Sequence, residues 1–280
     1  MSDAVAAARE ACTTLRWHPA LRKSMGPARV EAVVRGARAS AALDGADLPL
    51  DQVRGLLAVD GSRPDAAADL RPDQRVALGA LRATSLAGEL GAVLATAPAQ
   101  AVARLHLAAA GQATDPLPTK GFDAEMALGA IGRPRGAGVR VVELVDLGPA
   151  PSGAELAARL DSLSALLIAP TDAPALVVAA VVHGELLVLR PFTSGNGLVA
   201  RAVSRALIQE RGLDPTAVAV PEVGHLAGGT ASYIGMAAAY ASGTVDGVRA
   251  WILHCATAIE LGAREGVAVA DAVLSGRLVR

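Results

Sequence analysis

The chain has 280 residues and a net charge of −1, so it is long enough to bury a large core and carries no electrostatic footprint for nucleic acid or for a membrane surface. Hydrophobic residues make up 52% of the chain, but aromatic residues only 2%. Because alanine, valine and leucine supply most of the apolar content, we expect a bundle of closely packed helices.

The cysteines and the N-terminal residues predict a protein of the cytoplasm. Cys12 and Cys255 lie far apart in the sequence without metal-site spacing, which is typical of buried thiols rather than of a disulfide. The N-terminus shows no basic segment followed by an apolar core, so no signal peptide is expected. The longest apolar run, Ala173–Val182, is too short to cross a bilayer.

Helical periodicity dominates residues 1–110, which we expect to form an N-terminal helical region. Helices are predicted over Ser2–Arg16, Arg29–Leu43, the later part of Leu48–Pro64, Gln74–Leu94 and Pro98–Ala110. The second of these is expected to stop at Asp44 and Gly45. His106, in the last of them, lies among alanine and leucine residues and is predicted to be a core or edge histidine.

Residues 111–280 are predicted to form the second region, which opens with a change in composition. From Gly111 to Gly138, glycine, proline and arginine accumulate, so no long helix is expected. Val139–Val145 is rich in valine and predicts one arm of a small β-hairpin. The alternative to a hairpin is a surface loop, in which the side chains of Arg133 and Arg135 would both be solvated.

Further helices are predicted in the second region. They cover Ala154–Leu167 with Ser152 as cap, Ala173–Leu189 after Asp172, Leu198–Arg211, Ala231–Ala241 and Val248–Gly262, with an extended Val218–Val223 segment between the third and fourth. Ala173–Leu189 is apolar on almost every side, so it should be the buried central helix. His254 and Cys255 are neighbours on the last helix and point in different directions, so no shared metal site is expected.

The stretch between the central helix and its successor, Arg190–Arg201, carries the main functional signal. Pro191 breaks the first helix, and Gly195 and Gly197 permit backbone angles that other residues avoid. Amides exposed at the start of the next helix favour an anion such as phosphate, and Arg201 is one turn further on. The alternative is a tight turn between helices with no ligand.

This stretch resembles the Fic (Fido-domain) signature His-Pro-Phe-x-(Asp/Glu)-Gly-Asn-Gly-Arg-x-x-Arg. Here it has the sequence Arg-Pro-Phe-Thr-Ser-Gly-Asn-Gly-Leu-Val-Ala-Arg. The resemblance implies an all-α, Fic-type helical bundle with a small β-hairpin flap, and relatives that transfer AMP from ATP to a hydroxyl of a target protein. The retained residues, expected to bind a nucleotide or phosphate together with Arg190, are Phe192, Gly195, Asn196, Gly197 and Arg201.

Two other segments extend the resemblance. Ser40–Gly45, at the end of the 30–45 segment, is similar to the inhibitory helix motif (Ser/Thr)-x-x-x-Glu-(Gly/Asn), with the shorter Asp44 as its acid. In the family this acid pairs with the last motif arginine, here Arg201, and blocks seating of the ATP γ-phosphate. The resemblance also implies a flap at about residues 130–146 that aligns a target segment by strand addition.

Three motif positions are substituted, and all three carry chemistry in the family. Arg190 replaces the histidine base, and an arginine stays protonated at neutral pH. Ser194 replaces the metal-binding carboxylate, so Mg²⁺ is only weakly expected. Leu198 replaces a phosphate-binding arginine. We therefore expect a catalytically impaired protein that binds ATP, another nucleotide or a phosphorylated ligand and has a regulatory role.

Two alternatives remain open from the sequence. One is an active nucleotidyl- or phosphotransferase whose rearranged site uses His183 or Glu185 as the base, although His183 is also expected to be a core residue. The other is a structural partner that acts through oligomerisation, for instance as a homodimer.

Overall fold

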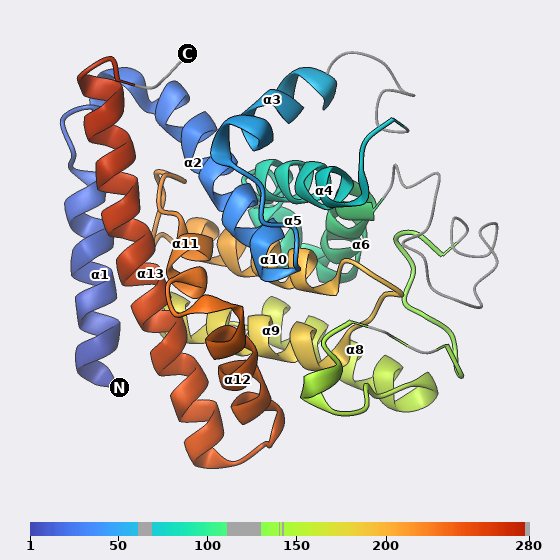
Figure 1. Cartoon of the computed structure of the whole chain (residues 1–280). Helices are drawn as coiled ribbons and strands as arrows, with labels where there is room; N and C mark the ends of the chain where they lie inside the picture. Colours follow the sequence, from blue (N-terminus) through green and yellow to red (C-terminus); the bar gives the residue numbers. More distant parts are fainter. Residues whose placement is uncertain (61–68, 111–129, 140, 142, 278–280) are drawn as a thin grey trace.

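The computed structural model describes residues 1–60, 69–110, 130–139, 141 and 143–277, and it is built from helices (Figure 1). The N-terminal helices are α1 (Ser2–Arg16), α2 (Leu21–Leu43), α3 (Leu50–Asp60), α4 (Pro72–Ala87), α5 (Gly91–Thr96) and α6 (Pro98–Ala110). The short 3₁₀ helix η1 (Val145–Leu147) precedes α8 (Gly153–Ile168), α9 (Ala175–Leu189), α10 (Asn196–Glu210), α11 (Pro221–Leu226), α12 (Gly229–Ala241) and α13 (Val245–Leu274). The expected all-α bundle is confirmed.

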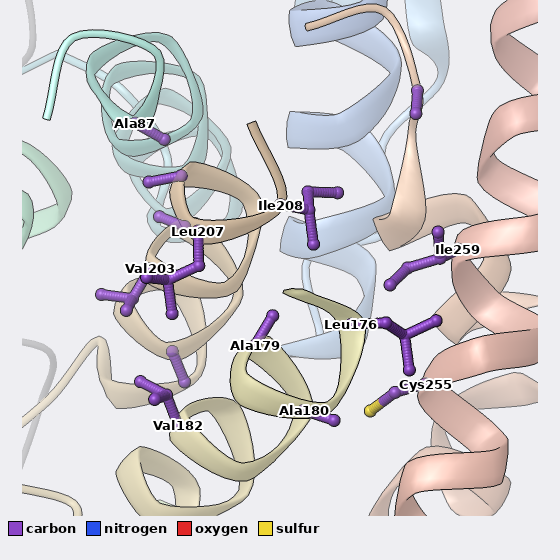
Figure 2. Packing of buried hydrophobic residues seen from close by; sticks show 14 of the residues in the cluster. Ala87, Leu176, Ala179, Ala180, Val182, Val203, Leu207, Ile208, Cys255 and Ile259 are labelled. Carbon is purple, nitrogen blue, oxygen red and sulfur yellow. The ribbon is translucent and has the colours of Figure 1, made fainter. Parts of the chain in front are cut away.

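The antiparallel pair α9 and α10 forms the centre of the bundle. Because α9 is apolar around its whole circumference, it buries residues on every side, as the sequence predicts. In Figure 2, Ala179 and Val182 of α9 face Val203 and Leu207 of α10. Among the described residues, no helix combines the length and the apolar character needed to cross a membrane.

The remaining helices wrap this pair. α4 and α6 pack against α10, and α13 packs against α9, α11, α12 and α1. Figure 1 shows α1 and the long α13 side by side along one edge of the molecule. One continuous core cluster joins Ala8 of α1 to Ala270 of α13.

Helix boundaries differ from the predicted ones in four places. The predicted Gln74–Leu94 helix is two helices, α4 and α5, because the chain leaves the helix at Gly88 and buries Leu90. α2 begins before Arg29, with non-helical angles at Ser24 that precede Pro27. α11 begins at Pro221, so only Val218–Val220 of the predicted extended segment lie outside a helix, and α13 continues to Leu274.

The β-hairpin flap expected at about residues 130–146 is not present among the described residues of this stretch, which form turns and η1. Leu144 has a φ of 51°, which takes the backbone out of the strand conformation. The carbonyl groups of Glu143 and Leu144 accept hydrogen bonds from the Arg190 side chain instead of pairing with a strand. Residues 111–129, 140 and 142 of the predicted loop and hairpin lie outside the described residues.

We predict that the close crossing of α11 and α13 tolerates no side chain at Gly224. A Cβ there would lie 2.0 Å from the Ala258 carbonyl oxygen, so Gly224→Ala should destabilise the fold by at least about 1–3 kcal/mol. Gly235→Ala is the matched control, because Gly235 is exposed inside α12 with open space at its Cβ position. It should stabilise the protein by about 0.5–1 kcal/mol. Chemical denaturation measures both values, and equal effects of the two substitutions would contradict this packing.

Candidate functional site

The turn between α9 and α10 is closed by its own residues. Arg190 ends α9 with a φ of 43° and Gly195 precedes α10 with a φ of 72°, so two left-handed residues reverse the chain. Inside the turn, the Asn196 side chain accepts the Phe192 N–H at 2.9 Å and donates to the Phe192 carbonyl at 3.0 Å. This pair of bonds requires an amide side chain, which can donate and accept at once.

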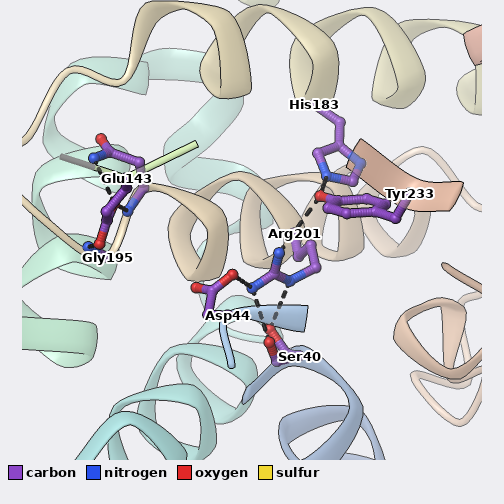
Figure 3. Close-up of polar contacts among 8 residues, drawn as sticks. Ser40, Asp44, Glu143, His183, Gly195, Arg201 and Tyr233 are labelled. Atoms are coloured by element: carbon purple, nitrogen blue, oxygen red, sulfur yellow. Dashed lines mark hydrogen bonds and ion pairs between the residues drawn. The ribbon is translucent and has the colours of Figure 1, made fainter. Parts of the chain in front are cut away.

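The predicted anion cradle is formed, and a carboxylate of the protein itself lies in it. The Gly195 N–H donates to one oxygen of Glu143 at 2.6 Å. The Asn196 N–H and its Nδ2 donate to the other oxygen at 3.1 and 2.9 Å (Figure 3). Burial, followed by the charge of Asp44, raises the pKa of Glu143 above its ordinary value, although the three hydrogen bonds oppose this shift. The cradle therefore accepts an anion in the form of an internal side chain.

Arg201 is bound to the end of α2. It is 2% exposed, and it donates to Asp44 at 2.8 Å and to the Ser40 hydroxyl and carbonyl at 2.7 and 2.9 Å (Figure 3). Tyr233 adds a weaker contact, 3.4 Å from Oη to the guanidinium. Burial alone would lower the pKa of Arg201, but Asp44 and Tyr233 outweigh it and the pKa is raised. The Asp44–Arg201 pair expected from the resemblance is thus present.

Gly197 has a steric role in this pair. A Cβ at this position would lie 2.5 Å from an Asp44 oxygen and 3.0 Å from the Arg201 guanidinium. The glycine therefore lets the Asp44 carboxylate approach the first turn of α10, while Gly45, with a φ of 88°, ends the preceding segment.

Arg190 does not point into the cradle. Its guanidinium donates to the carbonyl groups of Leu144 and Gly148, both at 2.8 Å. Arg135 binds the other side of the same junction, since it donates to the carbonyl groups of Arg190 at 2.8 Å and of Pro151. The expectation that Arg190 and Arg201 converge on one anion is not met in this structure, because the carbonyl groups of Leu144 and Gly148, on either side of η1, already accept the Arg190 donors. The predicted solvation of Arg135 is likewise wrong, because its side chain is buried.

The other substituted motif positions also have structural roles. Leu198 is buried among apolar residues of α2, α3 and α4. The Ser194 carbonyl accepts a hydrogen bond from His106 Nε2 at 3.1 Å. Neither position supplies a charged group to the cradle.

His106 and Glu143 are site residues that the sequence analysis did not assign. His106 stacks on Phe192 with ring centroids 3.8 Å apart and accepts the Gly132 N–H at 2.9 Å. It is buried, as predicted, and it joins α6 to the motif turn. Glu143 comes from a stretch that was expected to be a strand, so its carboxylate carried no signal of this role.

The two candidate replacement bases lie away from the cradle. His183 is completely buried, and its Nε2 lies 2.8 Å from Tyr233 Oη. Glu185 accepts hydrogen bonds from Arg159 at 2.8 Å and from Tyr240 at 2.9 Å. This placement does not favour either side chain as a general base at the motif turn.

Several solved structures share this fold. A Fic family protein from Desulfovibrio desulfuricans matches with a TM-score of 0.68 and 19% identity, over 100% of this chain and 77% of that one. The C. elegans protein Fic-1 matches with a TM-score of 0.69 and 19% identity, over 95% of this chain and 72% of that one. A Fic domain containing signaling protein from Bacteroides thetaiotaomicron matches with a TM-score of 0.62 and 12% identity, over 99% of this chain and 100% of that one.

This chain has the Fic fold, with the motif turn at the α9–α10 junction. No protein-family model matches its sequence, and no curated protein does. The fold thus supports the resemblance that the motif residues suggest.

We predict that protonation of His106 destabilises the motif turn. Burial lowers its pKa from 6.5 to about 4, so the unfolded chain takes up a proton at a higher pH than the folded one. The stability that this residue contributes is complete above pH 6.5 and is lost as the pH falls to about 4, a change on the order of 3 kcal/mol.

Unfolding measured at a series of pH values in wild type and His106→Gln tests this expectation. Glutamine can accept from Gly132 and donate to Ser194 but does not titrate, so the variant should lose less stability on acidification. Because the buried His183 and His225 also have lowered pKa values, only the difference between the two proteins is assigned to His106. Parallel pH profiles would contradict the assignment.

Proposed function

We propose that this Fic-fold protein is related to protein adenylyltransferases but transfers no AMP, and that it binds a phosphate-bearing ligand such as a nucleotide at the α9–α10 turn. The observation that carries the proposal is the cradle formed by Gly195 and Asn196, whose three donors hold the Glu143 carboxylate. A phosphate oxygen has the same charge and accepts the same bonds, so it can exchange with this carboxylate. The raised pKa of Glu143, caused first by desolvation and then by the charge of Asp44, supports such an exchange, because this carboxylate carries its charge at a cost in free energy.

The chemistry needed for transfer is missing from the turn. A general base would have to lie within hydrogen-bond reach of the attacking hydroxyl, and Arg190 is engaged with backbone carbonyl groups. The residues do not fit a Mg²⁺ site, since Ser194 offers a neutral hydroxyl and the oxygens of Glu143 are already bonded to N–H groups.

The end of α2 supports a regulatory role. Asp44 and Ser40 occupy the Arg201 donors that the family resemblance assigns to phosphate. A ligand phosphate must compete with Glu143 for the amides and with Asp44 for the guanidinium, so two internal carboxylates limit its affinity. Any signal that shifts α2 relative to α10 would change this affinity.

A purely structural role is the second candidate. The observation in its favour is that the cradle donors and Arg201 are already bonded within the protein, so the turn can be stable without a ligand. In that case the chain would act through a partner protein or a second copy of itself. Both thiols are free and buried, which supports the cytoplasmic location expected for either role.

We predict that Glu143→Ala increases affinity for phosphate, because it removes the competing carboxylate and leaves the amides in place. Calorimetric titration with inorganic phosphate, AMP, ADP and ATP, with and without Mg²⁺, should show binding that is tighter than in wild type by about tenfold or more. Asp146→Ala is the matched control, since it removes an exposed carboxylate three residues further along the same segment. Absence of binding in both wild type and Glu143→Ala would support the structural role instead.

We predict that Asp44→Ala changes ligand affinity and stability in opposite directions. Arg201 would become available to phosphate, so binding should tighten, whereas loss of the partner of a buried guanidinium should lower the melting temperature. Asp47→Ala, which removes an exposed carboxylate bonded to Arg38, should leave the affinity unchanged. Lower stability without any gain in affinity would count against the regulatory role of Asp44.

A further inference from the structure

Three helices, α9, α11 and α13, bring two histidines and a cysteine together in the core. One ring nitrogen of His183 (α9), one of His225 (α11) and the Cys255 sulfur (α13) all lie within 4.8 Å of one another. All three residues are buried, at 0%, 3% and 3% exposure. In Figure 2 the Cys255 side chain extends from α13 towards α9. The sequence analysis expected no metal site, because Cys12 and Cys255 lack metal-site spacing and the neighbours His254 and Cys255 point in different directions, and it did not consider this grouping.

One buried nitrogen of this group, in the His183 ring, has no hydrogen-bond partner among the described residues. Nε2 of His183 is bonded to Tyr233 Oη, but Nδ1 is buried and has no hydrogen-bond partner among the described residues. A buried polar atom without a partner costs about 1–3 kcal/mol, so native structures usually satisfy such atoms with water, an ion or another side chain. The orphaned nitrogen therefore points to a ligand.

We infer that His183, His225 and Cys255 form a binding site for a soft metal cation, Cu⁺ or Zn²⁺, bound by two imidazole nitrogens and a thiolate. Soft thiolate ligands select these ions, and imidazole suits both. The inference stands on the buried grouping and the orphaned nitrogen and is independent of phosphate binding at the turn.

The hydrogen bond that one nitrogen of each imidazole ring makes leaves the other nitrogen to bind a metal. His225 Nδ1 lies 3.0 Å from His254 Nε2, so its Nε2 remains available to a metal. His183 Nε2 is held by Tyr233, so its Nδ1 remains available. Each of the two histidines is thus oriented by an outer side chain, an arrangement that is usual around bound metals. Tyr233 also contacts Arg201, so the metal site and the Asp44–Arg201 pair share one residue.

The charge of the surroundings favours Cu⁺ over Zn²⁺. Two neutral imidazoles and one thiolate balance a single positive charge, whereas Zn²⁺ would leave one positive charge in a buried site. Tyr233 Oη lies 2.8 Å from His183 Nε2 and 3.4 Å from the Arg201 guanidinium, so a fixed positive charge is already close to the site and an additional one would be unfavourable. Burial raises the pKa of the Cys255 thiol, which means that the metal must displace its proton on binding.

Metal retention by the full-length chain tests this site. The protein is refolded anaerobically under reducing conditions with excess Cu⁺ or Zn²⁺ and passed over a weak chelator, and the metal is then measured by mass spectrometry. We expect wild type to retain about one cation per chain and to gain melting temperature, with Cu⁺ held more tightly than Zn²⁺. Cys255→Ser and His225→Gln should each retain at least about tenfold less.

Cys12→Ser is the matched control, because it removes the other buried thiol and leaves Cys255 as the single cysteine. It should retain the metal as wild type does, and its Cu⁺ form should show ultraviolet thiolate-to-copper charge-transfer absorption that the metal-free protein lacks. This second measurement needs only a folded Cys12→Ser protein, so the test remains decisive if Cys255→Ser fails to fold. Retention of neither metal by wild type, equal retention by Cys255→Ser, or a Cu⁺ form without the band would overturn the inference.

Discussion

The binding of Arg201 by the end of α2 is the interaction on which the site depends. A buried guanidinium is stable only when its donors are matched by acceptors, and here Ser40 and Asp44 supply three of them. These bonds fix the position of α2 against α10, and Gly197 is needed so that the carboxylate can reach its place. The Tyr233 contact extends the same network to α12 and, through His183, to the centre of the bundle.

Internal carboxylates satisfy both of the anion-binding features of the turn. Glu143 lies on the amides at the start of α10, and Asp44 lies on Arg201. The donors of the turn and of Arg201 are therefore satisfied within the protein, so the fold needs no external anion to pair them. Under the proposed phosphate binding, an external anion has to compete with Glu143 and Asp44, so two substitutions far apart in the sequence should act on one property.

The substituted motif residues Arg190 and Leu198 make structural contacts inside the bundle. Arg190 and Arg135 tie carbonyl groups at the end of α9 to the segment before α8, and the α-helix dipole of α9 favours positive charge at this end. Leu198 completes the apolar contact between α10 and the N-terminal helices. Restoring the family's polar residues at these positions would thus remove structural contacts as well as add chemistry.

The sequence by itself determined the helical class, the central position of α9, the turn at Pro191–Gly195 and the acid that pairs with Arg201. These features depend on local periodicity, on residues with special backbone freedom and on a motif of fixed spacing, all of which can be recognised along the chain. Only the tertiary structure decided that Glu143 lies in the cradle, that Arg190 binds carbonyl groups, and that His183, His225 and Cys255 meet. Those contacts join segments between about 30 and 70 residues apart, and their geometry follows from how the helices pack, so no pattern along the sequence encodes them directly.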